Sequence, residues 1–405
     1  MCIILERAIH PVGCGLFATE LFHHCHYPFH YPFHYPFQYS VVYDCGQGRA
    51  KTTPIELQSI IDSYFDSVDH IDLLFISHFD NDHVNGINYL INKGYIDGNT
   101  QVVLPLIDNI EHFDLYEFVN EYRYKELLEA FNEKNVHIAK IRPISENQDI
   151  PGEPRSGGDV PQDDDGHIIL GNELDSFSDV TTCSPIRKFW HYYPYYIQDD
   201  KIFSEFLDYC TQPHIIDKKT IYPFTKAELK DFVNLNKDRQ KDLKKLYKSF
   251  KKGKHSGNGV TQINMNAIGL ISCEDTSCCC EDVHYYGNNY TCKPLIRTHR
   301  PSCLYTSDLS LSESLFLNKV KRGCKRYAPN GIGLFQIPHH GSYKCYSSKI
   351  YNNFDFDALF VNGEIESTNP AISPDVINDS WKYQKTLFLA DKRCNLGQIC
   401  CLMPL

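Results

Sequence analysis

Apolar and polar positions alternate on two length scales in the first third of the chain. Short, almost continuously apolar runs predict strands buried between two layers: His70–Ser77, Asn99–Leu106 and Val136–Pro143. Longer segments with apolar residues at helical spacing predict helices between them: Pro54–Val68, His83–Gly94 and Asp114–Asn135. Strands that alternate with helices in this way indicate an α/β fold.

Strands are also expected at both ends of the chain. The segments Ala8–Phe22 and Tyr39–Gly48 have the pattern of a hairpin. Further strands are predicted in the second half: His167–Gly171, Ile186–Tyr196, Thr261–Cys273, Ser302–Ser310, Gly331–Ser342, Phe356–Gly363 and Lys385–Leu402. This order predicts a single domain over residues 1–405, in which two packed sheets are flanked by helices.

Three segments interrupt the pattern. Residues 23–38 repeat Tyr-Pro-Phe-His, and proline at every fourth position excludes a helix or a central strand. We expect a low-complexity hairpin loop there, without a catalytic role. Residues 145–166 are polar and predict a loop. Residues 199–259 are rich in Lys and Asp and read as mostly helical, so we expect a lysine-rich insertion outside the core.

Composition places the chain among ordinary globular proteins, with 42% hydrophobic and 22% charged residues. No run approaches about 20 apolar residues, so no membrane span is expected, and without a signal-like N-terminus we expect a cytoplasmic protein. The net charge of −11 disfavours a protein that coats nucleic acid along its whole surface. The basic stretch Lys237–Lys254 makes the remainder more acidic still.

The 17 cysteines are expected to be reduced thiols, because nothing in the sequence indicates secretion. One group is dense: Cys273, Cys278, Cys279 and Cys280. It could hold a structural zinc, but it lacks two separated Cys-x-x-Cys pairs, so a surface loop is the favoured interpretation.

The strongest chemical signal follows the strand His70–Ser77. His78, Asp80, Asp82 and His83 fall within six residues in the stretch HFDNDH. A buried strand delivers the loop after it to a fixed point, where α/β sites tend to lie. Imidazole and carboxylate groups both bind Zn, Mn or Fe, so two ligand pairs could hold two cations side by side. A polar loop with satisfied histidines is the alternative.

Four distant motifs also place His or Asp near the end of a predicted strand. They are YDCG with Asp44, FWHYYP with His191, YTSDLS with Asp308, and IPHHGS with His339 and His340. Side chains at such positions can converge. A packed core histidine is the alternative for His191, and a simple turn residue is the alternative for Asp44.

Together these motifs resemble the metallo-β-lactamase fold superfamily, and are most similar to the soluble hydrolase domain of ComEC/Rec2-type proteins. That family has a Gly-x-Gly hairpin, here VGCG, an Asp-x-Gly strand end, here DCG, and a metal loop that resembles HFDNDH. The segment NMNA, with Asn264 and Asn266, resembles its Asn-x-Asn-Ser strand, and its His-His-Gly-Ser motif is intact. The resemblance implies a four-layer αββα sandwich that carries the helical insertion.

The chain departs from the family pattern at three places. Asn85-Gly86 replaces a glycine pair, and Ser307-Asp308 replaces Gly-Asp but keeps the carboxylate. A late Asn-x-Tyr-Gly-His-Pro segment survives only as STNPAISP, without its histidine. That loss bears on substrate handling more than on metal binding.

The resemblance implies two divalent metal ions, Zn or Mn. One ion would be bound by His78, Asp80 and His191. The second would be bound by Asp82, His83 and one of the two histidines His339 and His340, and Asp308 would bridge the ions. Because Asp80 replaces the more usual second histidine, the first site is richer in oxygen and has a lower preference for Zn relative to Mn.

The same resemblance assigns roles in catalysis. Asp82, Asp308 and His340 are expected to take part in the reaction. The histidine of the His339–His340 pair that binds no metal would, with Ser342, contact the substrate or protonate the leaving group. Asp44 would orient a ligating histidine by accepting a hydrogen bond from its other nitrogen.

The implied activity is phosphodiester hydrolysis by a metal-activated water, with nucleic acid as the expected substrate. The lysine-rich insertion could bind the nucleic-acid backbone, although alternating Lys and Asp also suit a solvated helix face. One alternative is hydrolysis of a small ester, lactone or nucleotide, since fold alone does not decide substrate. Another is a non-catalytic protein that binds a partner, not identifiable from the sequence, and retains the metal site.

Overall fold

The computed structural model describes twelve parts of the chain: residues 2–24, 37–106, 123–144, 150, 172–181, 184–197, 200–230, 235–255, 267–287, 299–312, 314–363 and 372–404. Several sequence features lie outside the described residues. They include most of the Tyr-Pro-Phe-His repeat, nearly all of the polar loop 145–166, the predicted strand His167–Gly171, Asn264, Asn266 and most of the STNPAISP segment.

The larger of the two main sheets has nine strands. Their order is β12 (Cys278–Gly287), β17 (Leu396–Pro404), β1 (Ile3–Ile9), β2 (Phe17–His24), β3 (Gln38–Cys45), β4 (Leu73–Phe75), β5 (Gln101–Pro105), β6 (His137–Arg142) and β7 (Asn172–Asp175). Pairing is antiparallel from β12 to β3 and parallel from β3 to β7. The parallel half brings the carboxyl ends of β3, β4 and β5 to one edge.

The smaller main sheet has six strands. Their order is β16 (Thr386–Ala390), β15 (Phe356–Asn362), β14 (Ile332–Gln336), β13 (Cys303–Tyr305), β11 (Ile268–Glu274) and β8 (Trp190–Tyr196). The run from β13 to β16 is parallel, and β11 is antiparallel to both of its neighbours. The carboxyl ends of β13 and β14 therefore also share an edge.

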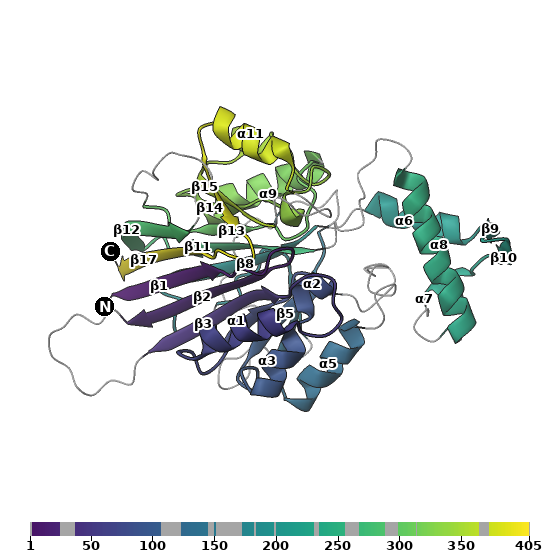
Figure 1. The fold of residues 1–405 in the computed structure, drawn as a ribbon, viewed down its shortest axis with the longest axis horizontal. Coiled ribbons are helices and arrows are strands. Elements are labelled where there is room, and N and C mark those ends of the chain that lie inside the picture. The colour runs from purple at the N-terminus through teal and green to yellow at the C-terminus, as the bar shows by residue number, and fades with distance from the viewer. Residues whose placement is uncertain are drawn as a thin grey trace.

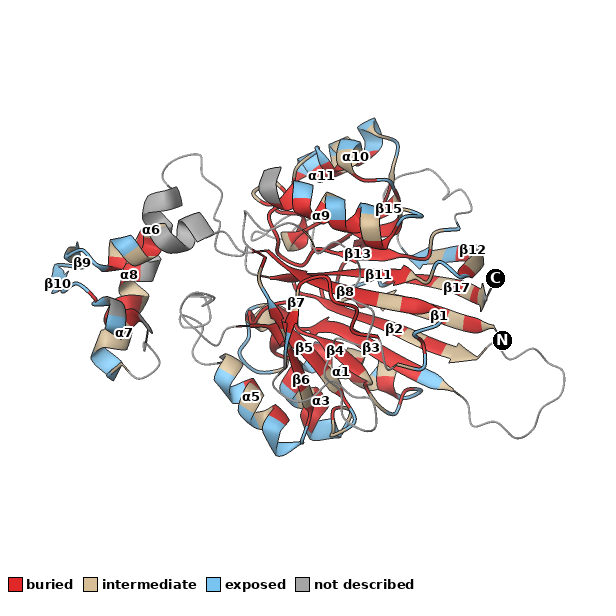
Figure 2. Ribbon diagram, turned by 180° about the vertical axis from the view of Figure 1, so that it is seen from behind, coloured by how far each residue is buried: buried red, intermediate tan, exposed pale blue. Residues whose placement is uncertain are grey.

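Helices cover the outer faces of both sheets (Figure 1). Apolar residues of the larger sheet form one cluster with α1 (Ile55–Phe65), α3 (Ile87–Lys93) and α5 (Arg123–Glu133). Residues of the smaller sheet form another with α9 (Ser314–Tyr327), α10 (Ile350–Asn353) and α11 (Pro374–Lys382). A third cluster fills the space between the sheets. Figure 2 shows that most strand residues of the two main sheets are buried, with residues of intermediate exposure along β1 and β17.

Side-chain alternation along β3 explains this layering. Val42 packs in the cluster under the helices, whereas its neighbours Val41 and Tyr43 pack between the two sheets. Successive side chains of a strand point to opposite faces, so a strand that is apolar at every position is covered on both sides. The α/β class predicted from the sequence is confirmed.

Residues 200–255 form a group of elements outside the two main sheets, hereafter the insertion module, and their buried apolar residues belong to the same cluster as those of the larger sheet. It contains α6 (Asp200–Cys210), β9 (His214–Ile216), β10 (Lys219–Ile221), α7 (Lys226–Lys230) and α8 (Lys237–His255). The strands β9 and β10 pair only with each other within the described residues. Their turn residues Asp217 and Lys218 have φ of 51° and 64°, as two-residue hairpins require.

The structure corrects two expectations about strands. Cys278, Cys279 and Cys280 begin strand β12 instead of forming a surface loop, and the strand pairs with β17. The segment Lys385–Leu402 divides into β16 and β17, which belong to different sheets. A turn separates the two strands. In this turn Asp391 Oδ1 accepts hydrogen bonds from the backbone N–H groups of Arg393 and Cys394. Among the described residues, no helix is long and apolar enough to cross a membrane.

Candidate metal centre

The edges of the two sheets meet where the sequence motifs lie. Asp44 and His78 follow or end the parallel strands β3 and β4, while Asp308 and the His339–His340 pair follow β13 and β14. Two hydrogen bonds join the edges through Ser77: its carbonyl oxygen accepts from Ile268 N at 2.8 Å, and its hydroxyl accepts from Ser307 Oγ at 2.8 Å. Parallel pairing within each sheet thus gathers distant segments at one point.

Two glycines let the metal loop dock against the first hairpin. A Cβ added to Gly46 would lie 2.3 Å from the carbonyl carbon of Asp82, and one added to Gly15 would lie 2.9 Å from its oxygen. Asp82 O also accepts a hydrogen bond from Leu16 N at 3.0 Å. The glycines of VGCG and DCG are therefore needed because three backbone segments touch there.

Asn85, which follows the metal loop, holds the neighbouring loop. Its Oδ1 accepts from Gln47 N at 3.0 Å, and its Nδ2 donates to the carbonyl oxygens of Gln47 and Ala50, each at 2.9 Å. The Asn85 side chain therefore links the metal loop to the segment after β3.

Three buried histidines are each oriented through Nδ1. The partner of His83 Nδ1 is Asp44 Oδ2 at 2.8 Å, and that of His78 Nδ1 is Ser77 Oγ at 2.9 Å. The carbonyl oxygen of Asn362, the last residue of β15, accepts from Nδ1 of the third histidine, His340, at 3.1 Å. Their Nε2 atoms are buried and make no hydrogen bond within the described residues.

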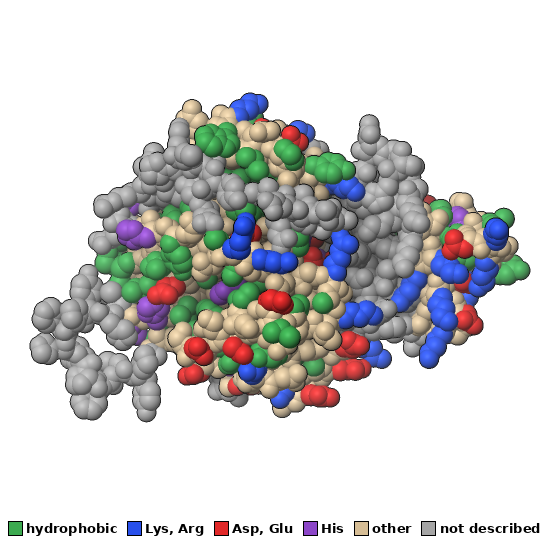
Figure 3. Space-filling view, viewed as in Figure 1, with side chains coloured by type: hydrophobic (Ala, Val, Ile, Leu, Met, Phe, Trp, Pro, Cys, Tyr) green, Lys and Arg blue, Asp and Glu red, His purple; other side chains and the backbone are tan. Residues whose placement is uncertain are grey.

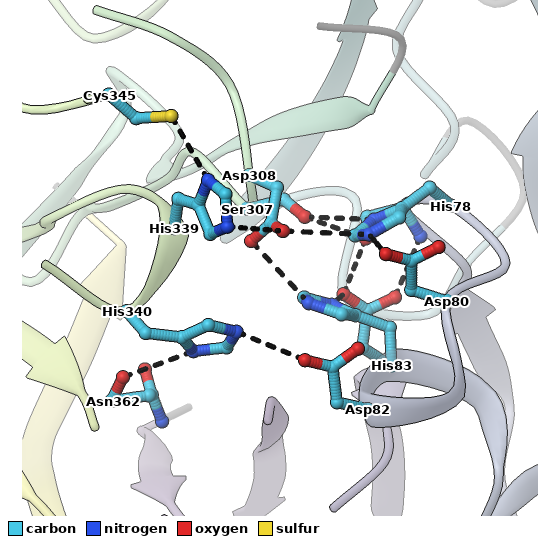
Figure 4. A network of polar contacts seen from close by, with 12 residues as sticks. His78, Asp80, Asp82, His83, Ser307, Asp308, His339, His340, Cys345 and Asn362 are labelled. Carbon is cyan, nitrogen blue, oxygen red and sulfur yellow. Dashed lines mark hydrogen bonds and ion pairs between the residues drawn. The ribbon is translucent and has the colours of Figure 1, made fainter. Parts of the chain in front are cut away.

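Carboxylates face these Nε2 atoms (Figure 4). Asp308 Oδ1 lies 3.5 Å from His83 Nε2, and Asp308 Oδ2 lies 3.8 Å from His78 Nε2. Asp82 Oδ2 lies 3.3 Å from His340 Nε2. Within each of two sets, His78–His83–Asp308 and Asp82–His83–His340, one ligand atom per residue lies within 4.8 Å of the others.

The remaining candidates lie at the margin of this cluster. Asp80 Oδ2 is 3.7 Å from His78 Nε2, and the Asp80 side chain is 10% exposed. His339 Nε2 is 3.8 Å from Asp308 Oδ2, and its ring is 23% exposed. Its other nitrogen contacts Cys345 Sγ at 3.0 Å. Of the two adjacent histidines, His340 thus faces the interior and His339 borders the solvent.

This arrangement fits a divalent cation. A buried imidazole nitrogen without a hydrogen bond is costly, and a metal ion would satisfy several of them at once. Imidazole plus carboxylate is a donor set for Zn, Mn or Fe. The supporting contacts to Nδ1 are also those that fix the tautomer and ring orientation of a ligating histidine.

The electrostatics of the cluster show why its groups hold one another in charged form. Burial alone would lower the pKa of His83, but the carboxylates of Asp308 and Asp44 raise it well above its usual value. Burial alone would raise the pKa of Asp308, but His339 and His83 lower it well below its usual value. Burial dominates for Asp80, whose pKa is raised. A bound cation would replace the proton on His83 and continue to stabilise these carboxylates.

Backbone strain is concentrated at the same place. Asp44, Ser307, His339 and His340 have φ of 54°, 47°, 49° and 55°. Non-glycine residues in this left-handed region cost about 1–2 kcal/mol each. Four strained residues from three separate segments all lie at the cluster, which is typical of a functional site held by the surrounding fold.

His191, expected to be a metal ligand, lies elsewhere. It pairs with Cys273 near the start of β8, whereas Leu270 on the same partner strand pairs with Tyr305, the last residue of β13, two residues before Ser307. Asp179 Oδ2 lies 2.7 Å from His191 Nδ1, and Asp275 Oδ2 lies 2.6 Å from its Nε2. Both ring nitrogens are thus occupied by carboxylates, and the structure does not bring His191 to the cluster.

The four-cysteine group and Ser342 were also candidates from the sequence. The four-cysteine group does not form a metal-binding set within the described residues. Ser342 is buried and shapes the loop after the histidine pair: its N–H donates to His339 O at 2.9 Å, and its Oγ accepts from Lys344 N at 3.4 Å.

Sequence reasoning missed the partners that orient the histidines. Ser77 precedes His78 directly, and a hydroxyl residue between a buried strand and a metal loop is a signal that could have been used. Asn362 acts through its backbone carbonyl and Cys345 follows the histidine pair by five residues, so neither has a recognisable motif.

No protein-family model matches the chain, and a search of curated proteins finds no significant relative. What the site can do must therefore be inferred from its residues.

Proposed function

We propose that this protein is a metal-dependent hydrolase with a metallo-β-lactamase-like αββα sandwich, similar to the soluble hydrolase domain of ComEC/Rec2-type proteins. The observation that supports the proposal most is the convergence of three buried imidazole Nε2 atoms, each on a ring fixed through Nδ1. A packed core histidine has both nitrogens satisfied, as His191 does. The three rings at the cluster keep one nitrogen each for a ligand.

Two divalent ions, Zn or Mn, would be held by the two overlapping sets of ligands. His78 and Asp308 belong to the first set, and Asp82 and His340 belong to the second. His83 lies within reach of both sets, but its single free nitrogen, Nε2, would bind one ion only, the second. Asp80 lies beside the first set and adds an oxygen donor there. His191 is not included in this ligand set.

The bound ions would supply Lewis acidity and lower the pKa of a water molecule from about 15.7 toward 7. The protein's own contribution is to fix the ligands and exclude bulk water: the side chains of His83 and Asp308 are only 1% and 4% exposed. Asp308 faces both His78 and His83 with different oxygens, so it suits the bridging position.

His339 is the residue best placed to touch a substrate. It is the more exposed member of the histidine pair, and its Nδ1 contacts the Cys345 thiol at 3.0 Å. If the thiol donates in that contact, Nε2 carries the proton and can donate to a phosphoryl or leaving-group oxygen. We therefore assign metal binding to His340 and substrate contact to His339.

A phosphodiester is the proposed substrate class. Two closely spaced cations suit a reaction in which charge develops on phosphoryl and leaving-group oxygens. The family resemblance of the motifs favours the same class over a small ester, lactone or nucleotide. A cheap assay separates these options: bis-p-nitrophenyl phosphate and a panel of lactones, each with Mn or Zn and with or without chelator. Lactone hydrolysis without diester hydrolysis would overturn the phosphodiester assignment.

Metal content tests the site itself. Wild-type protein reloaded with Zn or Mn is expected to hold two equivalents by elemental analysis, and Asp80→Ala and Asp308→Ala are expected to lose metal. Asp69→Ala, at an exposed carboxylate after α1, is the matched control and should keep both equivalents. If Asp80→Ala and Asp308→Ala both retained two equivalents, the ligand assignment would be wrong.

A further inference from the structure

Charge is divided unevenly between the insertion module and the rest of the chain. Residues 200–255 contain 14 Lys and Arg but 8 Asp and Glu, a net charge of +6, so the remainder carries −17. All of the excess lies in α8, which has eight Lys and one Arg against two Asp, a net charge of +7. A helix this basic on an acidic protein creates a local positive potential that attracts polyanions.

The packing of α8 determines which side of the helix the lysines occupy. Leu243, Leu246 and Phe250 are buried in a cluster that includes apolar residues of α6, β10 and α7. At 100° per residue, Lys237 and Lys241 lie on the opposite face, and both are exposed. Lys244 and Lys245 continue this row and are half-buried. Figure 3 shows Lys and Arg side chains gathered on the surface of the module.

Charges on the other side of α8 are neutralised within the module. Arg239 donates to Glu228 Oε1 and to the carbonyl oxygens of Tyr222 and Pro223. Asp242 accepts from Lys219 Nζ at 3.1 Å. Arg239 therefore contributes to the structure of the module. Among the α8 lysines whose side chains the structure describes, Lys237, Lys241, Lys244 and Lys245 lie away from the buried face, and they define the lysine face.

One acidic residue lies beside the lysine face. Asp238 Oδ1 is 3.8 Å from Lys241 Nζ, and the two side chains are 89% and 72% exposed. Such an exposed, long-distance pair contributes little and is easily exchanged for a stronger partner. The spacing of the lysines suits a polyanion: at about 1.5 Å rise per residue, Lys237, Lys241 and Lys245 are about 6 Å apart along the helix.

We propose that the lysine face of α8 binds the sugar–phosphate backbone of nucleic acid and holds the strand that the metal centre cuts. The inference deepens the proposed hydrolase function and rests on it for its substrate. In Figure 1 the module stands beyond the same end of the sandwich as α2 (Asn81–Val84), the helix that carries Asp82 and His83. Because the acidic remainder repels a polyanion, we expect binding to depend on the lysine face.

The test compares two triple variants of the full-length chain. Lys237→Ala/Lys241→Ala/Lys245→Ala removes three charges from the lysine face. Lys134→Ala/Lys349→Ala/Lys382→Ala removes three exposed lysines from the sandwich and is the matched control. Binding of a fluorescein-labelled 30-nucleotide single-stranded DNA is measured by anisotropy in EDTA at several salt concentrations, and circular dichroism verifies folding.

The lysine-face variant is expected to bind about 10- to 100-fold more weakly at about 0.1 M salt, with a salt slope lower by about 2, since each phosphate contact contributes about 0.7 to the slope for single strands. The control should match wild type. Equal affinity and slope for wild type and the lysine-face variant would overturn the inference. So would binding of wild type to phosphatidylserine vesicles but not to DNA.

Hydrolysis of bis-p-nitrophenyl phosphate separates this inference from the proposed function. All three proteins should cleave this small diester equally, because it does not need the lysine face. If none cleaves it while the lysine-face variant still loses DNA affinity, the hydrolase proposal fails and the binding surface stands. If all cleave it and DNA affinity does not change, the hydrolase stands and the binding surface fails.

Discussion

Asp44 organises the histidines of the cluster although we do not propose it as a metal ligand. It accepts hydrogen bonds from Ser77 N at 2.7 Å, from Ser77 Oγ at 2.6 Å and from His83 Nδ1 at 2.8 Å. Since Ser77 Oγ also contacts His78 Nδ1 at 2.9 Å, one carboxylate holds two rings, one directly and one through a hydroxyl. Such supporting contacts set ring orientation and ligand basicity.

Replacing Asp44 with Asn should therefore weaken metal binding. The amide has only one accepting oxygen, so Oδ2, which serves both Ser77 Oγ and His83, is lost. We expect the affinity for Zn or Mn to fall about 10- to 100-fold, measured by competition with a chromophoric chelator.

The control for this prediction is Asp72→Asn. Asp72 Oδ2 accepts from Ser40 N at 2.7 Å, near the other end of the same pair of strands. This variant should lose some stability but keep its metal affinity. An equal loss of metal affinity in both variants would contradict the role assigned to Asp44.

His191 should make stability depend on pH. Burial alone would lower its pKa, but Asp179 and Asp275 raise it above the usual value. A group whose pKa is raised by folding stabilises the fold fully below its unfolded pKa, about 6.5, and this contribution is lost as pH rises through the folded pKa. His191→Gln should therefore lower the free energy of unfolding more at pH 5.5 than at pH 9.

The measurement is the free energy of unfolding from urea titrations in EDTA. A charge-assisted hydrogen bond contributes about 1.5–3 kcal/mol, which sets the scale of the loss at pH 5.5. His284→Gln, at an exposed position of β12, is the matched control and should show no such pH-dependent loss. If His191→Gln lowered the free energy of unfolding equally at both pH values, the predicted protonation of His191 in the folded state would be excluded.

At the scale of elements, docking of the metal loop depends on one close backbone approach. A Cβ at Gly46 would meet three backbone atoms of Asp82 and His83 at 2.3–2.4 Å, which no side-chain motion can relieve. Gly46→Ala should lower the free energy of unfolding by about 2–4 kcal/mol. It should also lower metal affinity, because the loop that carries Asp82 and His83 must move.

Gly48→Ala is the control for this prediction. Its φ of 57° strains an alanine by about 1–2 kcal/mol, but no atom lies within 4 Å of the added Cβ. Thermal unfolding should therefore show a smaller loss for Gly48→Ala, with metal content unchanged. If Gly46→Ala bound metal like wild type, close backbone contact would not be what positions the loop.

The strands that carry the cluster were predictable because their sequences repeat one pattern. Buried runs followed by His or Asp place ligands at carboxyl ends, and parallel pairing then brings Asp44 beside His78 and Asp308 beside the histidine pair. Other elements had no such pattern. Strand β12 begins with three cysteines and contains a register shift between Cys280 and Val283, so its alternation is broken.

The surroundings of His191 were not predictable for a different reason. Its sequence context, FWHYYP, resembles a metal-binding strand end, but its partners Asp179 and Asp275 come from segments 12 and 84 residues away. The sequence pattern around a histidine does not predict which distant carboxylates the fold brings to its ring. Which end of a strand a residue occupies also depends on register, and His191 lies at the start of β8.

At the scale of the whole molecule, the cluster joins two sheets that are also held together by apolar packing and by buried hydrogen bonds to Glu20. His78, Asp82 and His83 belong to the larger sheet's edge, and Asp308 and His340 to the smaller sheet's edge. A cation bound by residues from both edges would therefore resist separation of the sheets. A ligand that binds the folded state but not the unfolded state stabilises the fold by about 2.7 kcal/mol when its free concentration is 100 times Kd.

Metal removal should accordingly lower the melting temperature. For wild type we expect EDTA to lower Tm by several degrees relative to Zn or Mn, as measured by scanning calorimetry. Asp308→Ala should melt at nearly the same temperature with and without chelator. If chelation changed its Tm as much as that of wild type, the stabilising ion would be bound somewhere other than between the sheets.

The pairing of β1 with β17, which sets Ile3 opposite Leu402 and Ile9 opposite Leu396, has a consequence for biosynthesis. Every proposed ligand, from His78 to His340, leaves the ribosome before the strand that fills the gap between β12 and β1. A nascent chain thus presents its acidic and imidazole groups on an unfinished sheet. We expect cation capture to follow the synthesis of β17, so that a stalled chain ending before residue 396 would fail to retain zinc.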